Sequence, residues 1–258
     1  MRLTKSKILT SALLLFVSVT SSAQFWDSST GLLQAPSAEM NRDGAFMITN
    51  NFMNKHSISE IYWGYHTFEY GFNINLWSRL EIGYVCVILD GKRKPGANSR
   101  DMIMFNQDRH FTAKALLLKE GEFGLPWMPA LAVGISDPTS AGGGDDYSKR
   151  SAGFFHRDYV VATKHFPTKI GTVGIHLGYQ YNRREELHMN GPCAAVDWVP
   201  VWLNSPAVSV KLIAEYDSRT FNMGFIASFW DDRFEAMFEL MAMKWVNFGV
   251  RYKLMLKK

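Results

Sequence analysis

The chain alternates between apolar and polar residues in many short segments. From residue 68 to residue 76, aromatic and aliphatic residues at even positions alternate strictly with Glu, Gly and Asn at odd positions. The same two-residue period returns at 172–181, 221–229 and 246–256. Because successive side chains of a β-strand point to opposite faces, this period predicts strands with one apolar and one polar face.

The pattern predicts an all-β fold of about twelve strands. The expected strands are 45–53, 67–76, 80–89, 110–119, 128–136, 157–166, 171–182, 194–202, 207–217, 220–230, 234–243 and 246–256. Short connections alternate with long polar ones, which is typical of barrels with short periplasmic turns and longer extracellular loops. An even number of strands then places both chain ends on the periplasmic side.

The faces of these strands favour a membrane barrel over a soluble sandwich. The apolar faces are long and aromatic, and aromatic residues make up 14% of the chain. The polar faces are rich in Gly, Asn and charge, which suits a crowded, wet lumen. We therefore expect residues 45–258 to form a closed antiparallel transmembrane β-barrel. Five tryptophans near strand ends predict an interfacial girdle, although they could instead be core residues: Trp77, Trp127, Trp202, Trp230 and Trp245.

Residues 1–23 are predicted to be a cleaved signal peptide. Lys5 and Lys7 precede an apolar run that ends in small residues at Ser21 and Ala23, so cleavage would leave Gln24 first. A retained anchor is the alternative, but the run is shorter than the ~20 residues of a spanning helix. The whole chain carries +4, and the three basic residues of this segment are its only charges, so the mature chain is at +1. That balance gives no reason to expect nucleic-acid binding.

Residues 24–44 form a lead-in segment that does not alternate. Its turn-rich stretch 31–38 is expected to plug or brace the periplasmic mouth of the barrel. Charged residues on the polar faces of the strands would be costly against lipid, so we expect them in the lumen. The residues singled out are Lys114, Lys164, Lys211, Glu215, Asp217, Glu235, Glu239, Arg251 and Lys253.

The lumen charges have two interpretations. They could be a salt-bridged filling of a narrow barrel, which we favour, or a charged lane for a solute or polymer. The last hairpin allows a specific prediction. If its turn is centred near Lys244, Glu235 faces Lys253 and Glu239 lies diagonally from Arg251, so that opposite charges pair across the strands.

The sequence predicts no enzyme, cofactor or metal site. Asp108, Arg109 and His110 are consecutive, so their side chains point alternately to opposite faces. His156 and Asp158 share a face, but no serine nucleophile accompanies them. No spacing of Cys and His suits zinc.

The two cysteines and a glycine-rich loop are not predicted to form functional sites. Cys86 and Cys193 lie on strands far apart in order, so we expect them to be unpaired, although an oxidising compartment would permit a disulfide. The glycine-rich acidic loop 142–146 lacks the following Lys and helix of a phosphate loop, and a calcium site there is a minor alternative.

Several segments resemble the YjbH-like outer-membrane proteins associated with exopolysaccharide production. The opening motif carries Gly31, Pro36, Ser37 and Ala38, followed by Asp43-Gly44. Segments 108–117, 129–137, 159–164 and 210–217 resemble the family in the same order. The resemblance implies an outer-membrane component that accompanies polysaccharide secretion. Charged residues within these segments are the candidates for polymer contact: Lys114, Lys164, Lys211, Glu215 and Asp217.

Together these features predict a non-enzymatic outer-membrane β-barrel that assists exopolysaccharide or capsule secretion. The expected partners are outer-membrane lipid, polysaccharide and proteins of a secretion system. A sealed scaffold or interaction barrel in an envelope complex is the main alternative. An outer-membrane enzyme that acts on lipid is the less favoured one.

Overall fold

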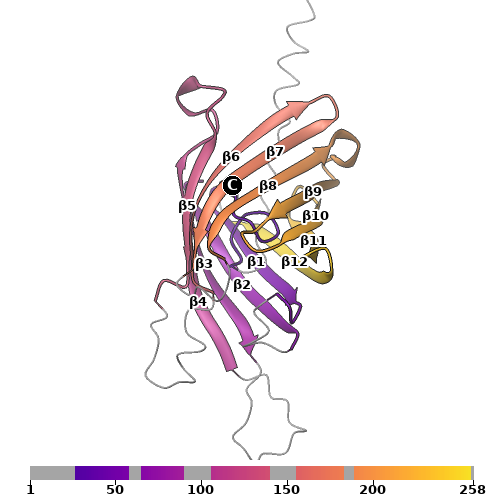
Figure 1. The fold of residues 1–258 in the computed structure, drawn as a ribbon. Coiled ribbons are helices and arrows are strands. Elements are labelled where there is room, and N and C mark those ends of the chain that lie inside the picture. The colour runs from indigo at the N-terminus through magenta and orange to yellow at the C-terminus, as the bar shows by residue number, and fades with distance from the viewer. Residues whose placement is uncertain (1–26, 58–64, 90–105, 140–154, 183–188, 257–258) are drawn as a thin grey trace, which may run out of the picture.

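The computed structural model describes residues 27–57, 65–89, 106–139, 155–182 and 189–256. They form a closed antiparallel barrel in which each strand pairs with its neighbours in sequence and β1 pairs with β12 (Figure 1). The strands are β1 (Ala45–Met53), β2 (Thr67–Leu76), β3 (Leu80–Leu89), β4 (Asn106–Leu118), β5 (Ala130–Ser136), β6 (Arg157–Thr168), β7 (Gly171–Tyr181), β8 (Gly191–Pro200), β9 (Val208–Tyr216), β10 (Phe221–Phe229), β11 (Phe234–Met241) and β12 (Trp245–Met255). The predicted all-β barrel is confirmed.

Two short 3₁₀ helices, Glu122–Gly124 and Val201–Leu203, lie in connections between strands. No helix in the described part of the chain is long and apolar enough to cross a membrane. The predicted signal peptide and the loop 142–146 fall outside the described residues.

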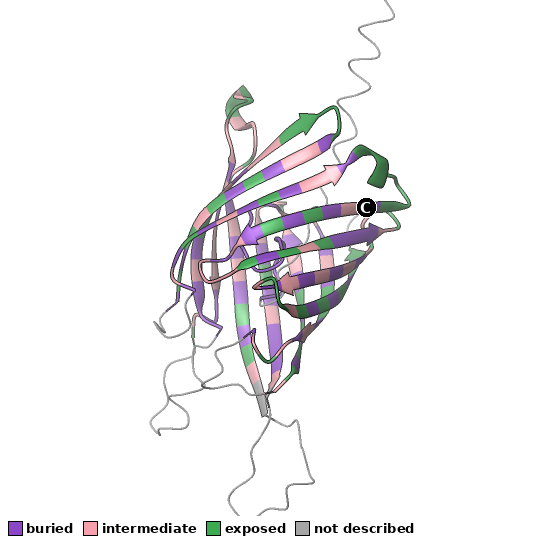
Figure 2. Ribbon diagram, turned by 45° about the vertical axis from the view of Figure 1, so that its right-hand side comes forward, coloured by how far each residue is buried: buried purple, intermediate pink, exposed green. Residues whose placement is uncertain are grey.

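Buried and exposed residues alternate along the strands, as Figure 2 shows. Phe72, Phe225 and Phe248 point outward and are 45%, 38% and 49% exposed. The asparagines and carboxylates between such residues point inward and are buried. An apolar outer surface around a polar interior is the arrangement that a lipid bilayer requires of a barrel. The structure is therefore a barrel of the outer-membrane type.

Four of the predicted girdle tryptophans are exposed, and all four lie at the end of the barrel where the turns are short: Trp77, Trp127, Trp202 and Trp230. Trp245 lies at the opposite end, where its ring stacks on His56 with centroids 3.7 Å apart. The amphipathic tryptophan rings thus lie at the two ends of the barrel, which is where the boundaries between lipid and water are expected.

The register of the last hairpin differs from the prediction. Its tight turn contains Ala242 and Met243, both with positive φ, and the strands pair about Met243 rather than Lys244. Glu235 therefore faces Arg251, and Glu239 faces Asn247, so the predicted Glu235–Lys253 facing pair is wrong. The predicted diagonal between Glu239 and Arg251 is wrong for the same reason.

The lead-in segment lies inside the barrel, where Figure 1 shows it as the indigo coil within the ring of strands. Every residue from Asp27 to Glu39 is buried, as is Asn41. We call residues 27–41 the plug. Glycines of the wall make room for it, because a Cβ at Gly71 would lie 2.6 Å from Ser28 Oγ and one at Gly224 would lie 2.9 Å from Leu33 Cδ1. The segment thus fills the bore and does not merely brace its mouth.

The two cysteines are free and buried, as the sequence predicted. Cys193 shares the lumen side of β8 with Asp197, whereas Cys86 on β3 alternates with the inward residues Glu81, Val85 and Val87. They therefore belong to opposite faces of the barrel wall, where a disulfide between them has no geometric basis.

Candidate functional site: the plugged lumen

Glu215 on β9 holds the centre of the plug. Its carboxylate accepts hydrogen bonds from three consecutive backbone N–H groups, those of Leu33 at 3.1 Å, Gln34 at 2.6 Å and Ala35 at 3.2 Å. A carboxyl group has two oxygens, so a single side chain can accept several hydrogen bonds at once. One wall carboxylate thus satisfies a run of plug backbone that could not otherwise be buried at low cost.

Other wall carboxylates bind the plug on either side of this point. Glu81 on β3 accepts from the backbone N–H of Thr30 at 2.7 Å and from the Thr30 hydroxyl. Glu239 on β11 accepts from Gln34 Nε2 at 2.8 Å. Ser28 Oγ donates to Glu69 on β2 and lies 2.6 Å from Thr49 Oγ1 on β1. The plug is therefore bonded to strands around much of the barrel.

Basic side chains of the wall bind plug oxygens. Lys114 Nζ on β4 donates to the carbonyl oxygens of Glu39, at 2.8 Å, and Thr30. Arg157 Nη1 on β6 donates to the carbonyl oxygen of Gln34 at 2.8 Å, and the same guanidinium forms an ion pair with Asp27. Burial alone would raise the pKa of Asp27, but Arg157 and the hydrogen bonds from Ser29 outweigh it and hold that pKa below its usual value.

Part of the lumen is apolar, which the prediction of a wet bore did not include. Leu32 and Leu33 of the plug are fully buried against inward-facing wall residues that include Val85, Ile213 and Ile226. Burying two leucine side chains contributes about 1.5–3 kcal/mol each by transfer from water. The plug therefore fits the bore by apolar packing as well as by hydrogen bonds.

The predicted lumen residues of the last strands form a network within the wall. Glu235 Oε2 lies 3.2 Å from Arg251 Nη1, and Glu235 Oε1 lies 2.6 Å from Lys253 Nζ. Asp217, just after β9, accepts from the backbone N–H groups of Arg219 at 2.8 Å and Thr220 at 2.7 Å. Asp217 thus stabilises a turn, and the Glu235 network braces the wall.

Lys164 does not face the lumen, contrary to the prediction. On β6 the inward positions are those of Arg157, Tyr159 and Thr163, and Lys164 belongs to the other face. Its Nζ forms an ion pair with Glu120 Oε1 at 2.9 Å in the connection between β4 and β5. Lys164 therefore secures a turn at the short-turn end of the barrel.

The residues of the opening motif that resembles the YjbH-like proteins lie within the plug. Gly31, Pro36, Ser37 and Ala38 are all buried in the bore, and Ala38 N donates to Thr163 Oγ1 at 2.9 Å. Ser37 Oγ accepts from the backbone N–H of Glu39 at 3.2 Å. These residues belong to the part of the plug that leads into β1.

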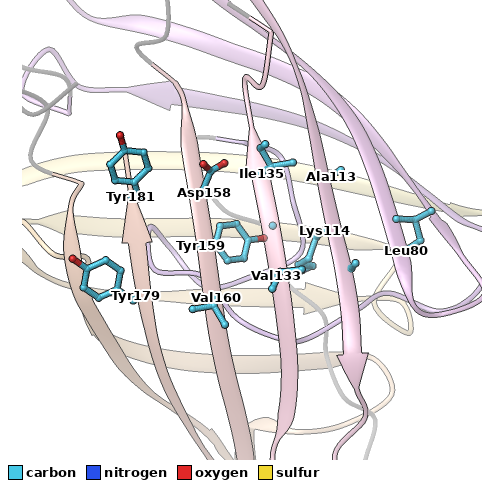
Figure 3. Close-up of a pocket in the computed structure, with 12 residues that line it drawn as sticks. Leu80, Ala113, Lys114, Val133, Ile135, Asp158, Tyr159, Val160, Tyr179 and Tyr181 are labelled. Atoms are coloured by element: carbon cyan, nitrogen blue, oxygen red, sulfur yellow. The ribbon is translucent and has the colours of Figure 1, made fainter. Parts of the chain in front are cut away.

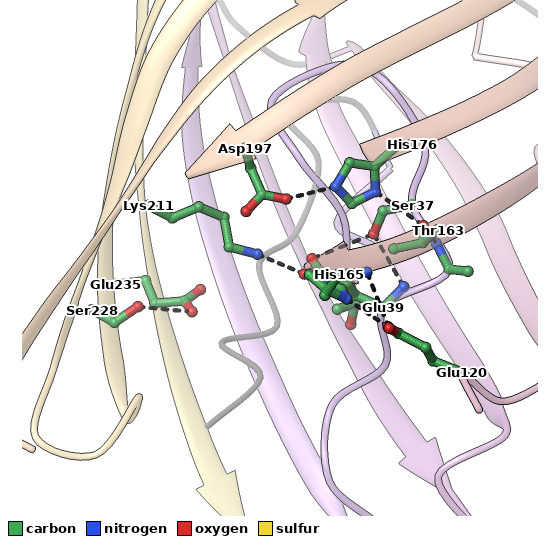
Figure 4. A network of polar contacts seen from close by, with 12 residues as sticks. Ser37, Glu39, Glu120, Thr163, His165, His176, Asp197, Lys211, Ser228 and Glu235 are labelled. Atoms are coloured by element: carbon green, nitrogen blue, oxygen red, sulfur yellow. Dashed lines mark hydrogen bonds and ion pairs between the residues drawn. The ribbon is translucent and has the colours of Figure 1, made fainter. Parts of the chain in front are cut away.

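A cluster that sequence reasoning missed lies beside Glu39 of the plug (Figure 4). His165 on β6, His176 on β7 and Asp197 on β8 place their ligand atoms within 4.8 Å of one another. Linear spacing could not show this group, since its members come from three strands. The pairing of the predicted strands 157–166 and 171–182 could have revealed the two histidines. It sets Thr163 opposite His176, so His165 lies diagonal to His176 across the strand pair.

The outer wall has a hollow of about 530 Å³ over β3 to β7 (Figure 3). The small side chains of Ala113 and Ala115 and the large ones of Tyr179 and Tyr181 are among those that line it. No Ser, Thr or Cys is among the residues that line it. Asp158, which also lines the hollow, places its Oδ2 3.5 Å from His156 Nε2, so these two residues, expected to share a face, lie in contact.

Comparisons with known proteins give one family match. The family model YjbH, described as "Exopolysaccharide biosynthesis protein YbjH", matches residues 24–257. Among solved structures, "KdgM porin" superposes with a TM-score of 0.47 at 10% identity, over 81% of this chain and 99% of that chain. "KdgM porin in complex with disordered oligogalacturonate" gives 0.46 at 10% identity with the same coverage. A search of curated proteins finds no match to this chain.

Proposed function

This chain belongs to the YjbH family of exopolysaccharide biosynthesis proteins, and on that basis we propose that it is a sealed, non-enzymatic outer-membrane barrel that assists exopolysaccharide or capsule secretion. Residues 27–41 carry the proposal, because they fill the bore and are bonded to the wall throughout. An open conduit for a polymer would have to expel this segment and leave Glu215, Lys114 and Arg157 without plug partners.

The plug also determines where partners can bind. Of the five charged residues predicted to contact polymer, Lys114, Lys211 and Glu215 bond the plug, while Lys164 and Asp217 secure turns. Contact with polysaccharide and with secretion-system proteins is therefore proposed for the ends of the barrel. The aromatic outer surface is proposed to contact outer-membrane lipid.

Secretion through a signal peptide cleaved after Ala23 is part of the proposal. Asp27 is buried in the bore, and four residues span at most about 14 Å of extended chain. An anchor that remained in the inner membrane at residue 23 could not reach a plug in the outer membrane. Mass spectrometry of the protein from its own envelope is expected to find Gln24 at the N-terminus, and a retained residue 1–23 segment would contradict this step.

A reversible lock of the plug tests whether the barrel works in its sealed form. Ser28 Oγ and Thr49 Oγ1 lie 2.6 Å apart, so Ser28→Cys with Thr49→Cys places two sulfurs near the ~2.05 Å of a disulfide. The background carries Cys86→Ala and Cys193→Ala to prevent other pairings. We expect cells with the oxidised lock to display as much surface polysaccharide as cells with the unlocked background protein.

Two controls complete this experiment. A strain that lacks the protein is expected to lose surface polysaccharide, and unchanged polysaccharide there would contradict the role in secretion. If the lock abolishes display and a reductant restores it, the plug must leave the bore during function, and the sealed form is then not the working one.

A further inference from the structure

We propose that His165, His176 and Asp197 of the wall, together with Glu39 of the plug, form a zinc site that fastens the plug to the barrel. The site does not depend on the role in secretion, since it concerns how the plug is held. Three adjacent strands supply the wall ligands, and the fourth comes from the segment that fills the bore (Figure 4).

The separations in the cluster can be compared with those around a tetrahedral ion. The ligand atoms of the three wall residues His165, His176 and Asp197 all lie within 4.8 Å of one another. Glu39 is not in that group, but its Oε1 lies 3.2 Å from His165 Nε2. His176 Nε2 lies 2.6 Å from Asp197 Oδ2. Ligand atoms around a tetrahedral Zn²⁺ with bonds of about 2.0–2.1 Å are about 3.3 Å apart. To close the shell, the wall ligands would draw together by up to about 1.5 Å, His176 Nε2 and Asp197 Oδ2 would part by about 0.7 Å, and Glu39 would turn its carboxylate toward the ion.

The second ring nitrogen of each histidine is already engaged. His165 Nδ1 lies 2.7 Å from Glu120 Oε2, and His176 Nδ1 lies 2.9 Å from Thr163 Oγ1. Both arrangements direct Nε2 toward the centre of the cluster. Metal-bound histidines nearly always have such a partner on the other nitrogen, and a carboxylate there makes the ligand more basic.

The strand wall is shaped around these groups. A Cβ at Gly174 would lie 2.1 Å from Asp197 Oδ2 and 3.0 Å from His176 Nε2. Only glycine leaves room at this point of β7 for the carboxylate and the imidazole to meet. Asp197, His176 and Glu39 are each almost fully buried, so the ion would be shielded from water.

An ion has a route to the cluster. A hollow of about 400 Å³ is lined by Glu39, Glu120 and His165, and it also touches Arg42 and Ser78 near the short-turn end of the barrel. The mixture of two imidazoles and two carboxylates favours Zn²⁺ over Ca²⁺ or Mg²⁺, which prefer oxygen ligands alone.

Lys211 is the competitor for this site. Its ammonium donates to Glu39 Oε1 at 2.7 Å, the oxygen that also faces His165. A bound ion would take that oxygen and shift the lysine to the other oxygen of the carboxylate. Removing the ammonium by Lys211→Met is therefore expected to tighten metal binding.

Cobalt provides the test, because tetrahedral Co²⁺ absorbs visible light and replaces zinc in such sites. The full-length protein, purified in detergent and stripped with a chelator, is titrated with Co²⁺ and then with Zn²⁺. We expect a visible band that saturates at one equivalent and disappears as Zn²⁺ displaces the cobalt. Absence of this band together with absence of Zn²⁺ binding heat would overturn the proposal.

Variants separate the site from adventitious binding. His176→Gln is expected to abolish the band, and Glu120→Gln, in a turn outside the strands, to weaken Co²⁺ affinity about 10–100-fold. His110→Gln changes another buried lumen histidine, which stacks on Phe155 away from the cluster, and is expected to keep wild-type affinity. Each variant is used after gel mobility with and without heating shows a folded barrel. Equal Co²⁺ affinity in wild type, His176→Gln and Glu120→Gln would also overturn the proposal.

Discussion

At the scale of single residues, the plug is held by buried groups whose partners lie far away in the sequence. Glu215 accepts from Leu33, Gln34 and Ala35, and Arg157 binds both Asp27 and the carbonyl oxygen of Gln34. A buried charge that loses its partner is costly, because water cannot replace the lost bonds. These residues should therefore respond far more strongly to substitution than charges on the outer face.

Glu215→Gln tests this difference. The amide keeps the size of the side chain but has one acceptor oxygen in place of two, so at least one buried plug N–H group loses its partner and we expect a loss of about 1–3 kcal/mol in the free energy of unfolding. Urea unfolding in lipid vesicles, followed by tryptophan fluorescence, measures it. Lys164→Gln is the matched control, since its ion pair with Glu120 is partly exposed and is worth less than about 1 kcal/mol. Equal losses in the two variants would show that Glu215 does not hold the plug.

Because of Asp27, we expect the free energy of unfolding to depend on pH in the acid range. Its pKa in the folded protein lies below its usual value despite burial, because Arg157 and Ser29 stabilise the carboxylate. The stability that it contributes is therefore present above the ordinary pKa of about 3.9 and is lost as the pH falls below it. Unfolding measured from neutral pH to pH 3 is expected to show a smaller acid-induced loss of stability for Asp27→Asn than for wild type. Parallel curves for the two proteins would exclude this contribution.

For individual residues, the sequence predicts correctly in some strands, but not in all, which side chains point into the lumen. Lys114, Lys211 and Glu215 lie in the lumen as the sequence predicts, because their strands alternate well between polar and apolar positions. Lys164 was placed on the wrong face. Residues 159–162 of its strand are Tyr-Val-Val-Ala, an apolar run without a two-residue period, so the sequence did not determine which positions point inward.

At the scale of elements, the tight turns carry backbone strain. Ala242 and Met243 have φ of 52° and 57°, a conformation that costs most L-residues about 1–2 kcal/mol each and that Asn and Gly adopt more easily. The absence of an Asn-Gly signal in this turn is one reason why its centre was predicted one residue too late. A one-residue shift of the centre displaced every facing pair of the hairpin by two positions.

Met243→Gly is expected to stabilise the barrel by about 1 kcal/mol, because glycine adopts positive φ without steric cost. The same urea unfolding experiment measures the change. Lys244→Gly is the control, since Lys244 is the next residue and is not among those with positive φ. A destabilised Met243→Gly protein would show that the Met243 side chain contributes more than the strain it imposes.

At the scale of the whole molecule, the barrel could be predicted but its filling could not. Period-two alternation determined the strands, their number and the outward direction of the aromatic faces, since each of these follows from local order. The path of residues 27–41 depends on contacts with strands up to the C-terminal end of the chain, such as that of Gln34 with Glu239. A segment without periodicity gives no local sign of such contacts.

Glycines on the polar faces gave a partial indication in the sequence that protein fills the lumen. The polar faces that the sequence predicts to line a crowded lumen include Gly71 and Gly224, and in the structure Ser28 and Leu33 of the plug occupy the space beside them. The inward Ile226 among polar neighbours was a second sign, because it packs in the same apolar cluster as Leu32 and Leu33. Polar faces interrupted by an apolar residue and by glycines thus indicate a lumen filled by protein rather than by water.

The conductance of single barrels in planar bilayers tests the filled bore most directly. We expect no steady conductance for the wild-type protein and a steady pore for a variant that lacks residues 27–41 but shows the gel mobility of a folded barrel. Both proteins contain the same twelve strands, so only the plug differs between them. A wild-type protein that conducts as steadily as the shortened variant would contradict the claim that its own N-terminal segment closes the barrel.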